Sequence, residues 1–82
     1  MQIDTIRNTI ISKFNQKTLL QNIDAEQDFF DLGASSLTIV DLQLQIEEVI
    51  GLCVTTGELM INPTLNGWID LYSKQESHEQ KI

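Results

Sequence analysis

The chain has 82 residues, of which 41% are hydrophobic, and its net charge is −7 at pH 7. This length predicts one small domain, and this hydrophobic content is too high for a disordered chain. We expect neither nucleic acid nor a membrane as partner, because the acidic charge repels nucleic acid and anionic lipid and no apolar run approaches the ~20 residues of a membrane helix.

The first predicted element is a helix that runs from near Ile3 to Asn15. Its apolar residues are spaced by three, four and four positions, which is the pattern of one helical stripe: Ile3, Ile6, Ile10 and Phe14. Residues 16–34 are predicted to form a long loop, and Gly33 breaks the chain before the next helix. Five apolar residues of this loop are candidates to anchor it to the core: Leu19, Leu20, Ile23, Phe29 and Phe30.

The second predicted helix begins at Ser35 or Ser36 and ends near Ile50, where Gly51 is a stop signal. At about 100° per residue, one side of it gathers only uncharged residues and is the predicted core face: Ile39, Leu42, Ile46, Val49 and Ile50. The opposite side mixes aliphatic with acidic residues: Leu37, Val40, Asp41, Leu44, Glu47 and Glu48.

This mixed face predicts a surface that docks another protein. Its aliphatic residues have no reason to face solvent, and burial of its acids without partners would be costly. An apolar strip for contact, with acids that steer a basic partner, accounts for both. No lysine or arginine lies between Lys17 and Lys74, so basic protein surfaces are the expected partners. The alternative is that the long loop covers these aliphatic residues.

The last third of the chain predicts a short helical turn around Thr56 to Met60 and then a helix with Thr64 as its N-cap. One face of this last helix is apolar, with Trp68 as a core anchor: Leu65, Trp68, Ile69 and Tyr72. From Lys74 onward we expect a polar, frayed tail, with the domain covering residues 1–75 and residues 76–82 disordered. The predicted fold class is therefore all-α, a small four-helix bundle with a long loop after the first helix.

Nothing in the sequence indicates catalysis. A serine nucleophile needs a base, and the only histidine, His78, lies in the predicted tail. No phosphate-binding loop, dinucleotide fingerprint or paired metal ligands are present, so we expect no metal and no enzymatic activity. A single cysteine, Cys53, excludes an internal disulfide, and together with the lack of a signal peptide this predicts a cytoplasmic protein, which we expect to be a monomer.

The segment "DFFDLGASSL", an acidic helix that ends in "EEVIG" and a later "NPTL" resemble the acyl and peptidyl carrier protein family. The resemblance runs from about Ile23 to Tyr72, and "FFDLG" is more similar to the peptidyl carriers, or thiolation domains, of nonribosomal peptide synthesis. It implies a four-helix fold and a covalent 4′-phosphopantetheine on Ser36, the serine directly before the leucine. The thiol of this group, which comes from coenzyme A, would hold an aminoacyl or acyl intermediate as a thioester.

The resemblance also implies the partners: a phosphopantetheinyl transferase, a loading enzyme that adenylates an amino acid, and tailoring or condensing enzymes. The position of Ser36 fits, because the start of a helix favours a phosphate. The family very often has aspartate where this chain has Ser35, which we expect to be the helix N-cap. We expect a free-standing carrier. The alternatives are an acyl carrier of fatty-acid or polyketide synthesis and, more distantly, a helical adaptor whose serines only cap a helix.

Overall fold

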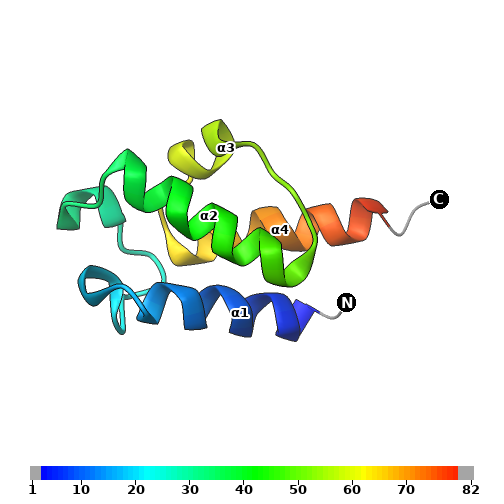
Figure 1. The fold of residues 1–82 in the computed structure, drawn as a ribbon, viewed down its shortest axis with the longest axis horizontal. Helices are drawn as coiled ribbons and strands as arrows, with labels where there is room; N and C mark the ends of the chain where they lie inside the picture. Colours follow the sequence, from blue (N-terminus) through cyan, green and yellow to red (C-terminus); the bar gives the residue numbers. More distant parts are fainter. Residues whose placement is uncertain (1–2, 80–82) are drawn as a thin grey trace.

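The computed structural model describes the backbone of residues 3–79 and the side chains of residues 4–76 (Figure 1). Its helices, in chain order, are α1 (Ile3–Asn15), α2 (Ser36–Ile50), α3 (Thr56–Ile61) and α4 (Leu65–Glu79). Two short 3-10 helices, η1 (Thr18–Leu20) and η2 (Phe29–Leu32), lie in the long connection between α1 and α2. These described residues contain no strand, and the all-α prediction is confirmed.

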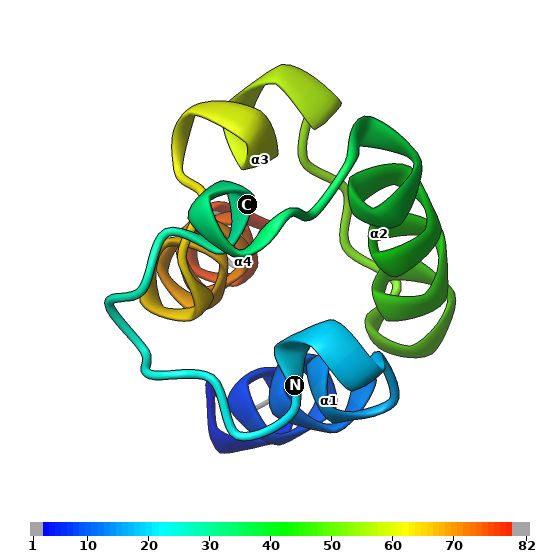
Figure 2. The ribbon, with the colours of Figure 1, turned by 90° about the vertical axis from the view of Figure 1, so that its left-hand side faces the viewer.

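The helices pack around one core, with α1 against both α2 and α4 (Figures 1 and 2). The short helix α3 packs against α2 and α4 and completes the bundle. Helices α1 and α2 run in opposite directions, so the start of α2 lies near the end of α1. Among the described residues, no helix is long and apolar enough to cross a membrane.

Three aromatic rings join α1, the long loop and α4 at the centre of the core. The Trp68 ring meets Phe14 and Phe29 edge to face, with centroids 5.2 and 5.6 Å away, and all three side chains are buried. The Trp68 indole Nε1 donates a hydrogen bond of 3.1 Å to the Leu59 carbonyl, which attaches α3 to this cluster. The prediction of Trp68 as a core anchor is confirmed.

The long loop is held to the first turn of α4. The Phe29 amide donates to the Pro63 carbonyl at 2.9 Å, and the Asn66 amide donates to the Ala25 carbonyl at 3.0 Å. Of the five predicted loop anchors, Leu20 and Phe29 are fully buried and Ile23 is half-buried, whereas Leu19 and Phe30 are exposed. The loop therefore rests on α4 and leaves the mixed face of α2 open.

Helix α4 extends to Glu79, so the expectation that it gives way to a frayed tail at Lys74 is wrong. The reason is that its buried stripe continues one turn further: Glu76, four residues after the buried Tyr72, is itself buried. His78 lies within this helix, but its side chain is outside the described residues, as are residues 80–82 of the expected tail. The domain boundary at residue 75 stays a prediction.

Candidate functional site

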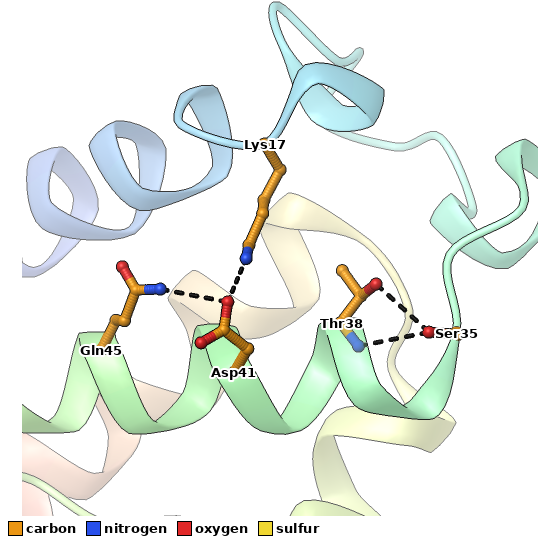
Figure 3. A network of polar contacts seen from close by, with 5 residues as sticks. All are labelled: Lys17, Ser35, Thr38, Asp41 and Gln45. Carbon is orange, nitrogen blue, oxygen red and sulfur yellow. Dashed lines mark hydrogen bonds and ion pairs between the residues drawn. The ribbon is translucent and has the colours of Figure 1, made fainter.

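The start of α2 gives its two adjacent serines different environments (Figure 3). Ser35 is the N-cap: its extended backbone precedes the helix, and its Oγ accepts a hydrogen bond of 3.3 Å from the Thr38 amide. The Ser35 Oγ also lies 3.3 Å from the Thr38 hydroxyl. The expectation that Ser35 caps the helix is confirmed, and Ser36 is the first helical residue.

Gly33 sets the entry into this site. It ends η2 with a left-handed backbone, φ 99°, a conformation that glycine adopts without steric cost. The Gly33 amide donates to the Phe30 carbonyl at 3.0 Å, and Ala34, the next residue, is buried. Ala34 thus fixes the chain to the core directly after this turn, and the two serines that follow it are exposed.

Ser36, the first residue of α2, does not cap the helix. Its side chain is exposed, and its Oγ has no hydrogen bond with any of the residues that the structure describes. The first backbone N–H groups of a helix have no acceptor within the helix, and they and the helix dipole favour an anion there. Because Ser35 takes the capping role, the Ser36 hydroxyl stays exposed to solvent.

A stripe of four residues runs along the exposed side of α2 from this point. Its members are spaced by four, three and four positions, and we call it the outer stripe: Leu37, Asp41, Leu44 and Glu48. The Leu37 side chain is 82% exposed and that of Leu44 is 64% exposed. The neighbouring Val40 is 40% exposed. The alternative that the loop covers these aliphatic residues is therefore wrong.

The acids of the outer stripe differ in their surroundings. Asp41 forms an ion pair with Lys17 and accepts a hydrogen bond of 3.1 Å from the Gln45 amide group (Figure 3). These contacts, that with Lys17 above all, hold the pKa of Asp41 below its usual value. Glu48 is exposed and has no hydrogen bond or ion pair to the described residues.

Glu47 is directed into the structure and holds three parts of it together. Its Oε2 accepts hydrogen bonds from the Val54 amide at 3.1 Å and from the Tyr72 hydroxyl at 2.9 Å. Burial, followed by the contact with Glu47, raises the pKa of Tyr72 above its usual range. Gln43 extends this network: its amide nitrogen donates to the Val54 carbonyl at 3.0 Å, and its oxygen accepts from the Thr56 hydroxyl at 2.6 Å.

Of the three acids expected to steer a partner, Asp41 and Glu47 have partners within the chain, whereas Glu48 has none among the described residues; their role in docking stays a prediction. On the core face, Ile39, Leu42, Ile46 and Ile50 are buried as predicted, but Val49 is 54% exposed. Val49 lies at the margin of that face, beside an open surface pocket whose other walls are polar residues of α1, so nothing covers it.

Sequence reasoning missed Lys17 and Gln43 as neighbours of the site. The only available signal for Lys17 was its place as the last base before nine acidic residues, and that signal does not identify Asp41 as its partner. Gln43 lies one turn before Glu47, a spacing at which two helical side chains meet, but its contacts with Val54 and Thr56 depend on the path of the loop.

Comparison with protein families gives a match between residues 4–72 and the family described as "phosphopantetheine attachment site". Similar curated proteins include a polyketide synthase–nonribosomal peptide synthetase of Aspergillus flavipes, 44% identical over 48 residues, which is 58% of this chain and 1% of that protein. The vanchrobactin synthetase of Vibrio anguillarum is 32% identical over 60 residues, 73% of this chain and 2% of that protein.

A nonribosomal peptide synthetase of Aspergillus aculeatus is 40% identical over 55 residues, 67% of this chain and 4% of that protein. This chain thus spans only 1 to 4% of the length of these three relatives. No solved structure matched the chain.

Proposed function

This chain belongs to the phosphopantetheine attachment-site family, whose members bind a 4′-phosphopantetheine prosthetic group, and we propose that Ser36 is the residue that carries this group. The observation that carries the proposal is the division of roles at the start of α2. Ser35 uses its hydroxyl to cap the helix, and the exposed Ser36 hydroxyl has no partner among the described residues.

In the modification, a transferase moves the phosphopantetheinyl group from coenzyme A to Ser36: the serine oxygen bonds to the phosphorus, the pyrophosphate bond of coenzyme A breaks, and adenosine 3′,5′-bisphosphate and the hydroxyl proton leave. The bound group supplies a thiol on which an aminoacyl or acyl intermediate is held as a thioester. The chain itself presents the hydroxyl, and the dipole of α2 and its first amides favour the new phosphate. We propose that partner enzymes perform all the chemistry, since the Ser36 hydroxyl has no hydrogen bond to a base among the described side chains.

We further propose that the carrier serves nonribosomal peptide synthesis, with an adenylating enzyme as its loading partner. The motif "FFDLG" and the similarity to a nonribosomal peptide synthetase of Aspergillus aculeatus support this assignment. The alternative is an acyl carrier, which the relative that is also a polyketide synthase keeps open. Aminoacyl loading from ATP and free amino acids, measured with candidate adenylating enzymes, would separate the two, since an acyl carrier would stay unloaded.

The docking surface that we propose for these enzymes is the exposed side of α2 beside Ser36. Leu37, Val40 and Leu44 supply apolar contact, and Glu48 supplies an acid that has no ion pair with any described residue. An enzyme on this surface reaches Ser36 at its edge, because Leu37 is the next residue.

The attachment point is tested by the two single serine variants. Ser36→Ala is expected to fold normally and to lose all modification by a phosphopantetheinyl transferase with coenzyme A. Ser35→Ala is expected to keep modification and to lose about 1 kcal/mol of stability, because its cap on the Thr38 amide is gone. Mass spectrometry of intact protein measures the first effect, and urea denaturation measures the second.

Peptide mapping decides the outcome. The phosphopantetheinyl group on Ser35, or its presence in the Ser36→Ala variant, would contradict the assignment. A wild-type protein that stays unmodified with several transferases would instead favour the helical adaptor.

A further inference from the structure

Asp41 lies in the middle of the outer stripe, between Leu37 and Leu44. It is four residues after Leu37 and three before Leu44, so a partner in contact with both leucines also covers Asp41. Glu48 lies one turn beyond Leu44, at the end of the stripe. The charge at Asp41 therefore affects which partner surfaces can bind to the outer stripe.

Lys17 controls that charge from another part of the chain. It lies 24 residues before Asp41, between α1 and η1, and its ammonium group forms an ion pair with the Asp41 carboxylate (Figure 3). The Lys17 backbone is fixed on both sides: its amide donates to the Phe14 carbonyl at 3.0 Å, and its carbonyl accepts from the Leu20 amide at 2.9 Å. The chain thus holds this lysine at the edge of α2.

The ion pair gives the outer stripe an uneven charge. Lys17 compensates Asp41 in the middle, whereas Glu48 at the far end is exposed and unpaired within the described residues. A partner cation opposite Asp41 would have to displace Lys17 or approach its positive charge. A partner cation opposite Glu48 meets neither obstacle.

We propose that Lys17 is a specificity-determining residue of this carrier, which neutralises the middle of the outer stripe and admits enzymes whose basic group faces Glu48. The expected partner surface is apolar where it meets Leu37 and Leu44 and cationic beyond Leu44. This inference rests on the proposed function, because it concerns the enzymes that act at Ser36.

The test compares two lysine variants that change the net charge equally. Lys17→Gln leaves Asp41 without an ion pair beside the site. Lys74→Gln does the same to Asp70, which pairs with Lys74 at 3.2 Å on α4, away from the outer stripe. Each variant is modified by one transferase with a basic carrier-binding surface, and kcat/KM is measured from low to high salt.

Lys17→Gln is expected to raise kcat/KM about twofold at low salt, as one added charge at about 10 Å in water would do. The gain is expected to vanish at high salt, because exposed charges are screened. Lys74→Gln is expected to change the rate little. Lys17→Arg, which keeps the ion pair, and the double variant Lys17→Gln with Asp41→Asn, which restores the local charge, are expected to return to the wild-type rate.

A structural effect of Lys17 would not produce this pattern, because a loosened fold would not respond to salt in this way or be corrected by removal of Asp41. Circular dichroism and urea denaturation of each variant check that it is folded. Two results would overturn this inference alone, provided that Ser36 is modified in every variant. One is an equal kcat/KM for Lys17→Gln and the wild type. The other is an equal gain in kcat/KM for Lys17→Gln and Lys74→Gln. Absence of modification at Ser36 in the wild type would overturn the proposed function and this inference with it.

Discussion

Glu47 and Glu48 are adjacent acids of α2 whose side chains contribute to different properties of the molecule. Glu47 accepts hydrogen bonds from the Val54 amide and the Tyr72 hydroxyl, and so links α2 to the loop before α3 and to α4. Glu48 is exposed and forms no hydrogen bond or ion pair with the described residues. One of these acids stabilises the fold, and the other is available to a partner.

This difference predicts opposite outcomes for two alanine variants. Glu47→Ala is expected to lower the free energy of unfolding by roughly 1–3 kcal/mol, because it leaves a part-buried amide and hydroxyl without their acceptor. Glu48→Ala is expected to change it by less than about 0.5 kcal/mol and to slow association with basic enzymes at low salt. Urea denaturation measures the free energy of unfolding of both variants. Similar midpoints for the two variants would show that Glu47 has no such structural role.

The residue scale is also where prediction from the sequence was weakest. The Ser35 cap, which the structure shows, followed from local capping rules, and the proposed role of Ser36 follows from the family motif. The ion pair of Lys17 with Asp41 and the contacts of Glu47 join residues that are 24, 7 and 25 positions apart. Helical spacing places a residue on a face, but it does not say which distant side chain meets it there.

At the scale of elements, the helices themselves could be predicted well. Helix α2 begins after a capping serine and ends at Ile50, and the φ of 73° at the following Gly51 is the left-handed conformation expected of a helix stop. The exception on its core face is Val49, because a residue at the margin of a stripe is buried only if the neighbouring helix offers an apolar surface. Helix α1 offers no apolar surface beside Val49, because the α1 residues there are polar: Thr5, Asn8, Thr9 and Ser12.

The two faces of α2 predict a second contrast between variants. Leu42→Ala and Ile46→Ala are expected to cost roughly 2–5 kcal/mol, because each side chain is fully buried and its loss leaves a cavity. Leu37→Ala and Leu44→Ala are expected to cost clearly less stability and to raise the KM of the loading enzyme instead. Denaturant midpoints that ranked these two pairs the other way would reverse the assignment of the faces.

At the scale of the whole molecule, the aromatic cluster of Phe14, Phe29 and Trp68 connects segments that are far apart in the sequence. The all-α fold and Trp68 as its anchor could be predicted, since both follow from periodicity. The course of the long loop could not, because it depends on hydrogen bonds between its backbone and the start of α4. No periodic pattern encodes such bonds.

Because Trp68 touches α1, the loop and α3, its environment changes only when the core as a whole opens. We expect tryptophan fluorescence and far-ultraviolet circular dichroism to give the same urea midpoint, as in two-state unfolding. Trp68 is the only tryptophan, so its signal needs no assignment. A fluorescence transition at clearly lower urea than the loss of helix would mean that α3 and the loop detach first.

The direction of α2 has a practical consequence. Helix α2, whose first residue is Ser36, begins at one end of the molecule, whereas α1 begins and α4 ends toward the other (Figure 1). The 15 residues of α2 alone separate these ends by about 22 Å. A bead or sensor chip coupled before Ile3 or after Glu79 would therefore hold the protein with Ser36 facing the solution. Immobilised in this way, the carrier would be presented to every enzyme in the same orientation, so that binding could be measured on a surface without blocking the proposed attachment point.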